Sequence, residues 1–258
     1  MGHWTVFYLG NNPFANELIL KSTLILHSMK IKYLLFTLLF SVFANAQELQ
    51  LNYDFLPERD YLTFTFEIFK PDKLGSTFLF TDFNFDRKDA ANLAYLEVAR
   101  KFNIKNKFIE GLNFHVEYND GLLMTNDKEG SPEDPLGFPI NRAFLVGFGF
   151  PIKIGDFTLN TSYLYKNTHG SSGFDGQFTA VWFYNIFGDK VTIRGFFDFW
   201  SEDRADGSSK KMILLTEPQV MYNLNKSFSI GSEIEISNNF VPTEEFKVFP
   251  TIMGRYAF

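Results

Sequence analysis

Polar and apolar residues alternate one by one along most of the chain after residue 46, and this period of two constrains the fold more than any other feature. In the segment 49–55 every second residue is leucine, tyrosine or phenylalanine, and polar residues stand between them. Successive side chains of a β-strand point to opposite faces, so such a segment predicts a strand with one apolar and one polar face. Twelve segments of this kind follow one another: 49–55, 62–68, 76–85, 92–102, 112–118, 142–154, 157–166, 177–187, 191–200, 212–224, 228–237 and 246–258.

The connections between these segments alternate in length from Asn119 onward. The turns Gly155-Asp156, Gly188-Asp189 and Asn225-Lys226 are tight, and the longer polar connections are 119–141, 167–176, 201–211 and 238–245. Outer-membrane barrels have short turns at one end, long loops at the other and an even number of strands. The sequence therefore predicts an all-β fold, a transmembrane antiparallel β-barrel of twelve strands with both termini in the periplasm.

The aromatic content supports a lipid-facing exterior, because 18% of the residues are aromatic and 33 of these are phenylalanine. So many large apolar rings need an apolar environment, which the lipid around a barrel provides. A barrel also closes its own sheet edges, so polar residues can face the inside.

The N-terminal segment has the pattern of an export signal. A short basic start, Met29–Lys32, precedes the apolar run Tyr33–Ala44, and Ala44-Asn45-Ala46 supplies small residues at a cleavage site. This pattern predicts a signal peptide over residues 29–46, with Met29 as the true start, residues 1–28 as a start-site artefact and 47–258 as the barrel. The expected location is the cell outer membrane of a Gram-negative bacterium, surrounded by outer-membrane lipid.

The polar faces of the strands are expected to line the lumen. Buried ionisable groups are costly unless they are hydrated or paired, so these side chains predict a water-filled lumen, a dense ion-pair network, or both. The residues on this face are Glu67, Asp82, Glu97, His115, Glu117, Arg142, Arg194, Asp198, Glu217, Gln219, Glu233, Glu235 and Arg255. Phe80, Phe183 and Trp200 are also predicted to face inward, where an aromatic ring can stack on a flat solute. For each of these lining residues taken singly, the alternative is a purely structural role.

Composition excludes several classes of function. The chain has no cysteine, so it offers no disulfide or thiolate site, and no cofactor is expected. The net charge is −6 and no basic cluster occurs, which argues against nucleic acid as a partner. The acidic loop residues Asp127, Glu129, Glu133 and Asp134 lack the spacing of a calcium-binding loop, so no metal site is predicted.

Several segments resemble a known family. They are the opening hairpin Tyr61–Ser76 with Phe78–Asp82, the strand Ala94–Phe102, the stretch Gly147–Pro151, and the run from Trp182-Phe183-Tyr184 to Phe197–Trp200. Together they resemble the nucleoside-specific channel-forming outer-membrane family, including its uncharacterised branch. The resemblance implies a twelve-stranded monomeric barrel with a narrow pore for nucleosides. The C-terminal residues Gly254–Phe258 resemble the signal read by the barrel-assembly machinery, the expected partner during insertion.

The leading hypothesis is a passive channel for small solutes rather than an enzyme. A first alternative, an outer-membrane lipid-modifying enzyme, requires Ser and His on the lipid-facing surface. His115 lies instead in the polar phase of its strand, and His169 lies in a loop beside Ser171 and Ser172. A second alternative is a plugged barrel that serves as an anchor, and Gly137-Phe138-Pro139 is the segment that would fold inward.

Overall fold

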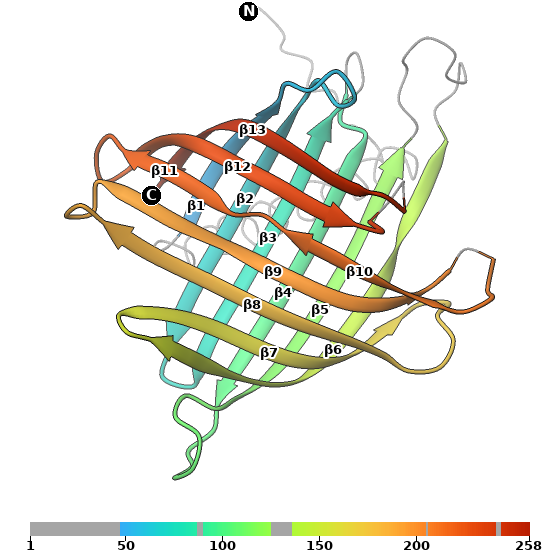
Figure 1. Cartoon of the computed structure of the whole chain (residues 1–258), viewed down its shortest axis with the longest axis horizontal. Coiled ribbons are helices and arrows are strands. Elements are labelled where there is room, and N and C mark those ends of the chain that lie inside the picture. The colour runs from blue at the N-terminus through green and yellow to red at the C-terminus, as the bar shows by residue number, and fades with distance from the viewer. Residues whose placement is uncertain (1–46, 87–89, 125–135, 205, 241–243) are drawn as a thin grey trace, which may run out of the picture. The chain divides into compact units, whose positions relative to one another are not determined.

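In the computed structural model, all regular structure among the described residues is β-strand, as the alternating pattern predicts (Figure 1). The structure describes residues 47–86, 90–124, 136–204, 206–240 and 244–258. The predicted signal peptide, the proposed start-site artefact and the four acidic loop residues lie outside these ranges. The strands are β1 Gln47–Asp54, β2 Tyr61–Asp72, β3 Gly75–Phe85, β4 Leu93–Asn103, β5 Asn113–Met124, β6 Gly137–Ile154, β7 Phe157–Thr168, β8 Asp175–Ile186, β9 Val191–Asp203, β10 Lys210–Thr216, β11 Gln219–Asn223, β12 Phe228–Asn238 and β13 Phe246–Ala257.

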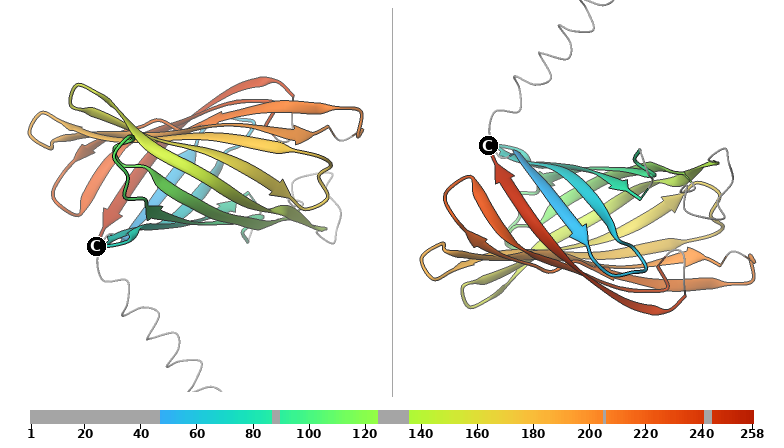
Figure 2. Two further views of the ribbon diagram at one scale, coloured as in Figure 1. Left: turned by 90° about the horizontal axis from the view of Figure 1, so that it is seen from below. Right: turned by 90° about the horizontal axis from the view of Figure 1, so that it is seen from above.

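The strands form one closed antiparallel sheet in which neighbours in sequence are neighbours in space. β13 pairs with β1 and closes the barrel, with Arg255 opposite Gln50 in the register (Figure 2). Both β10 and β11 pair with β9 on one side and with β12 on the other, so these two segments form one interrupted strand. The thirteen segments thus make a twelve-stranded barrel, and the predicted fold class and strand count are confirmed.

The interruption between β10 and β11 lies at Glu217-Pro218. Proline has no backbone N–H and cannot donate to the ladder, so a proline inside a strand breaks the regular pairing. The backbone N–H of Glu217 still donates to the carbonyl of Phe196 at 3.2 Å. On the neighbouring strand stands Gly195, where a Cβ atom would lie only 2.6 Å from the Glu217 carbonyl oxygen. A residue without a side chain therefore lets the two strands approach at the break.

The two ends of the barrel carry different kinds of connection. The end where β1 begins and β13 ends, here called the end of the termini of the barrel, has the connections 73–74, 104–112, 155–156, 187–190 and 224–227. The opposite end has 55–60, 86–92, 125–136, 169–174, 204–209 and 239–245. Apart from 104–112, the first set is the shorter one, so the alternation predicted from Asn119 onward agrees with the strand order. Gly155 has a left-handed backbone conformation, with φ of 59°, and this conformation permits the two-residue turn 155–156.

The hairpin of β5 and β6 extends much further than the sequence pattern predicts. The connection expected over 119–141 is reduced to 125–136, because β5 continues to Met124 and β6 begins at Gly137. Met124 pairs with Gly137 and Leu123 pairs with Phe138, past an irregularity between Asn119 and Gly121. The prediction that Gly137-Phe138-Pro139 folds into the lumen is therefore wrong, since ladder hydrogen bonding holds this segment within the hairpin.

The outer face of the sheet is apolar and rich in packed aromatic rings. Phe114 contacts Phe148 across β5 and β6 with ring centroids 5.6 Å apart, and Phe178 contacts Tyr163 and Phe197 at 5.0 and 6.1 Å. Such rings are exposed in the isolated chain but suit contact with lipid. In the part of the chain that the structure describes, no helix is both long and apolar enough to cross a bilayer.

Candidate pore lining

The lumen side of each strand is fixed by contacts between strands that are not neighbours. Arg194 on β9 hydrogen-bonds Glu48 on β1, although β11, β12 and β13 lie between these strands in the sheet. Such a contact is possible only across the inside of the barrel. Directly paired residues share a face, so the register extends this assignment from strand to strand. One inward row runs Glu48, Glu67, Phe80, Glu97 and Asn119, from β1 to β5.

A network of ion pairs crosses the lumen near the end of the termini of the barrel. We call it the arginine network, and its residues are Glu48, Glu67, Arg194, Gln219 and Arg255. Arg194 Nε donates to Gln219 Oε1 at 2.6 Å, and Arg255 Nε donates to Glu48 Oε2 at 2.6 Å. Arg194 Nη1 also lies 3.8 Å from Glu67 Oε1. These contacts hold β9 against β1 and β2 and narrow the lumen at this level.

A second ion pair draws the connection 55–60 inward at the opposite end. Arg59 donates twice to Glu235, at 2.7 and 2.9 Å, in the bidentate arrangement that makes arginine–carboxylate pairs strong. Its guanidinium carbon lies 3.6 Å from the centroid of the Phe249 ring, close enough for a cation–π contact. The predicted lumen residue Glu235 thus serves to fix this connection against β12 and β13.

Between these two levels the lumen carries carboxylates without ion-pair partners. We call them the carboxylate belt: Asp82, Glu97, Asp198, Glu217 and Glu233. Within the described ranges no basic group approaches any of them to within 4.0 Å. Thr65 donates to Asp82 and Thr179 donates to Asp198, each at 2.6 Å, and Gln219 donates to Glu233 at 2.5 Å. Neutral donors alone do not offset the cost of dehydrating several ionised carboxylates, so the belt side chains need water to carry a charge.

His115 belongs to a separate, tightly packed cluster. Its Nδ1 lies 3.0 Å from Ser162 Oγ, and its Nε2 lies 3.1 Å from Glu117 Oε2 without the alignment of a hydrogen bond. A Ser, His and Glu in contact resemble the components of a hydrolytic triad. However, Ser162 is 0% exposed and His115 is 2% exposed, so neither lumen solute nor membrane lipid reaches the hydroxyl. The cluster is a packing arrangement.

The two serines beside His169 are held by other partners. Ser171 Oγ donates to Asp175 and accepts a hydrogen bond from Lys210 Nζ at 3.1 Å. Ser172 binds Asp203 through its backbone N–H at 2.7 Å. Both serines therefore stabilise the connection 169–174 against β9 and β10.

Among the described residues, no group of three or more His, Asp or Glu side chains is arranged to hold a metal ion.

One predicted lining residue, Arg142, is placed differently from the prediction, and another, Trp200, is covered by a neighbouring side chain. Arg142 precedes the buried, inward Ala143 on β6, so it shares the outward face with Phe144 and is exposed. Its prediction as a lumen residue is wrong. Trp200 does face inward, but it is only 7% exposed because Lys166 lies over its ring, with Nζ 4.4 Å from the centroid. A solute therefore has little access to the Trp200 ring.

The register places the remaining predicted lining residues on the lumen side. Phe80 stands between Glu67 and Glu97, and Phe183 stands opposite Arg194. Several further residues face inward beyond those predicted, and all of them occupy the polar phase of their strands. They are Glu48, Gln50, Tyr95, Lys101, Asn119 and Lys166. The alternation itself was sufficient to identify them.

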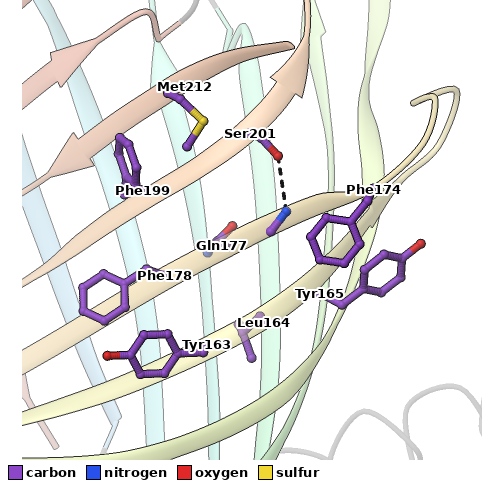
Figure 3. Close-up of a pocket in the computed structure, with 10 residues that line it drawn as sticks. Tyr163, Leu164, Tyr165, Phe174, Gln177, Phe178, Phe199, Ser201 and Met212 are labelled. Carbon is purple, nitrogen blue, oxygen red and sulfur yellow. Dashed lines mark hydrogen bonds between the residues drawn. The ribbon is translucent and has the colours of Figure 1, made fainter.

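An apolar groove on the barrel is not part of the lumen. It has a volume of about 570 Å³ and runs along β7, β8 and β9 beside Gly176, where a missing side chain leaves room (Figure 3). Rings of Tyr163, Phe178 and Phe199 border it, and these belong to the outward rows of their strands. The groove therefore faces the surroundings of the barrel, and its lining is mostly apolar, with Gln177 and Ser201 among its few polar side chains.

Comparison with known proteins agrees with this architecture. A family model described as a domain of unknown function (DUF5020) matches residues 46–258. Among solved structures, a NanC porin aligns with a TM-score of 0.50 at 11% identity, over 83% of this chain and 99% of the porin. A KdgM porin, also solved in complex with disordered oligogalacturonate, aligns with a TM-score of 0.46 at 10% identity, over 82% of this chain and 98% of the porin. No curated protein matches the chain.

Proposed function

The chain belongs to the DUF5020 family, and its barrel has the fold of outer-membrane porins. From this premise we propose that the protein is an outer-membrane channel that lets small polar solutes cross by passive diffusion. Its lipid-facing exterior, its short turns at the end of the termini and its polar lumen all suit this role. The family whose model matches the chain is not the nucleoside-specific family of the sequence resemblance, so the family match names no solute.

The carboxylate belt is the single observation that carries the proposal. Five acidic side chains from five strands of the barrel stand in the lumen without ion pairs, and Glu97 lies within electrostatic range of Asp82 and Asp198. In a dry, plugged core, each unpaired charge would cost several kcal/mol. Water in the lumen removes this cost, and a hydrated path through a barrel is a channel. Acidic groups also outnumber basic groups along this path, so the channel is expected to prefer cations.

Nucleosides are the first solutes to test. The inward rings of Phe80 and Tyr95 lie 5.7 Å apart by their centroids, next to Asp82 and Glu97. A ring on such a wall stacks on a flat base, and carboxylates accept hydrogen bonds from sugar hydroxyls. The resemblance of the opening strands to nucleoside channels supports the same choice.

The test is single-channel recording of the folded segment Gln47–Phe258 in a planar bilayer. Stepwise conductance with a reversal potential that favours K⁺ over Cl⁻ supports the channel, and absence of conductance refutes it in favour of a plugged anchor. Saturable block of the current by adenosine or thymidine supports nucleosides as solutes. Conductance without such block, at millimolar nucleoside, refutes the nucleoside assignment and leaves the channel intact.

The cation preference has its own variant test. Replacement of Asp198 by Asn removes one charge of the carboxylate belt but keeps a side-chain oxygen that can still accept the hydrogen bond from Thr179. The ratio of K⁺ to Cl⁻ permeability should fall, while the control Glu244→Gln, at an exposed position beyond the strands, should leave it unchanged. Equal ratios in both variants would show that the belt does not set the preference.

A further inference from the structure

We infer that the groove along β7, β8 and β9 binds one acyl chain of a lipid of the outer leaflet. This inference goes beyond the proposed channel and does not depend on it, because the groove lies on the outside of the barrel. Its volume of about 570 Å³ falls within the range of roughly 300–1,000 Å³ that is typical of ligand sites. A space of this size can hold a hydrocarbon chain.

Small residues form the floor of the groove. Gly176 stands on the outward face of β8, and its backbone N–H donates to Ser201 Oγ on β9 at 3.2 Å (Figure 3). The next outward row toward the middle of the barrel is filled by rings, since Phe178 is paired directly with Tyr163 and with Phe199. The change from rings to small side chains therefore leaves a hollow that large side chains border.

The border of the groove at its loop end is apolar and exposed. Tyr165, Phe174 and Met212 are 38%, 73% and 44% exposed. Phe174 belongs to the connection 169–174, whose other residues are polar or glycine, and its ring centroid lies 5.3 Å from that of Tyr165. Exposure of such side chains to water is unfavourable. The arrangement therefore suits contact with hydrocarbon.

The position of the groove along the barrel indicates the outer leaflet. The groove lies next to the connections 169–174 and 204–209, at the end away from the termini of the barrel. In outer-membrane barrels the end with the longer loops faces the outside, and aromatic girdles mark the lipid–water interface. Tyr163 and Tyr165 suit this interface, because each has an apolar ring and a polar tip. A chain in the groove would therefore be continuous with the lipid that surrounds the barrel.

The charged groups at the loop end of the groove already bind one another. Lys210 Nζ lies 2.8 Å from Asp175 Oδ2 and 2.6 Å from Asp203 Oδ1. Ser201 Oγ, on the floor of the groove, donates to Asp175 Oδ1 at 2.7 Å. Two carboxylates around one ammonium group carry no excess positive charge that would attract a phosphate. Recognition therefore rests on the hydrocarbon chain, and the charge of the lipid headgroup should matter little.

Native mass spectrometry of the folded protein in detergent micelles tests the site, with dipalmitoyl phosphatidylethanolamine as the probe. Titration should show saturable binding of one lipid molecule to each barrel. Dipalmitoyl phosphatidylglycerol is the matched probe, since it has the same chains and an anionic headgroup. The two lipids should bind with similar affinity, because the groove contacts the chain that they share.

Substitutions at the floor decide whether the lipid occupies this groove. A Cβ atom at Gly176 would lie 3.5 Å from the Phe174 ring and 3.7 Å from the Leu164 carbonyl oxygen, which are ordinary contacts, so a side chain fits there. Gly176→Phe should fill the hollow and weaken lipid binding at least tenfold, which corresponds to ~1.4 kcal/mol. Gly176→Ala should weaken binding less. Phe174→Ser removes one border of the groove outside the strands and should weaken binding too.

Val220→Phe is the matched control, because it adds a ring at an exposed outward position of β11, away from the groove, and it should leave lipid binding unchanged. The heat-dependent shift in gel mobility shows that each variant is folded. Unchanged binding in folded Gly176→Phe would overturn the inference, and so would a strict requirement for the anionic headgroup. Dimers that form without lipid and are lost in Gly176→Phe would also overturn it, because they would assign the groove to a second copy of the chain.

Discussion

Replacement of Arg194 by Met gives the clearest test of the arginine network. Methionine keeps much of the length and volume of the side chain but removes its charge and donors. Glu67 then loses its only basic contact among the described residues, and Glu48 keeps Arg255 alone. The side chains of Arg194 and Glu48 are only 11% and 9% exposed, so this is a largely buried ion pair.

Loss of one partner from a buried pair costs about 3–5 kcal/mol. Because Arg255 still neutralises Glu48, we expect the low end, about 3 kcal/mol. With an m-value of about 3 kcal/mol per molar urea, the unfolding midpoint should fall by about 1 M. The assay is urea unfolding of the barrel in detergent micelles, followed by the fluorescence of Trp182 and Trp200.

Arg204→Met is the matched control. Arg204 is 37% exposed and its partner Glu244 is 54% exposed, so this surface pair should contribute below about 0.5 kcal/mol. Its midpoint should therefore shift by less than about 0.2 M urea. If Arg194→Met shifts the midpoint no more than Arg204→Met, the network does not hold β9 against β1, and the reasoning from burial is refuted.

Two further substitutions test local packing by the same unfolding assay. Gly195→Ala should lower the free energy of unfolding by about 1–3 kcal/mol, because the new Cβ would lie 2.6 Å from the Glu217 carbonyl oxygen and 2.8 Å from the Trp182 ring. An unchanged free energy of unfolding would mean that the strand break tolerates a side chain. Ser162→Ala should lower the free energy of unfolding by about 1–3 kcal/mol, because it leaves His115 Nδ1 without its partner. The conductance should stay unchanged. A loss of conductance with unaltered stability would contradict a packing role.

Period-two alternation was enough to predict the strand count, the closed barrel and most of the lumen face. This success has a physical basis, because the lipid-facing and lumen-facing sides of a barrel strand differ at every residue. The same rule accounts for the error at Arg142. Phe144, Val146 and Phe148 set the outward phase of β6, and Arg142 shares their parity. The residue type suggested the lumen, whereas its position places it outside.

The contacts inside the lumen could not be predicted in this way. Alternation shows that Arg194 and Glu48 face inward, but not that they meet across three intervening strands. That contact depends on barrel closure and strand stagger, which the sequence pattern does not specify. The continuation of β5 and β6 was missed for a related reason, since Gly137-Phe138-Pro139 has turn-forming residues, and only its pairing with β5 keeps it extended.

The unusual length of β6 has a consequence for how a cell would present this protein. A strand of 18 residues extends about 60 Å, and a tilt of about 40° leaves about 45 Å along the barrel axis. The apolar band of an outer-membrane barrel is about 25 Å tall. The far part of the β5–β6 hairpin therefore rises beyond the lipid on the side away from the termini. It would be the first part of the molecule that an antibody, a bacteriophage or a protease in the medium encounters.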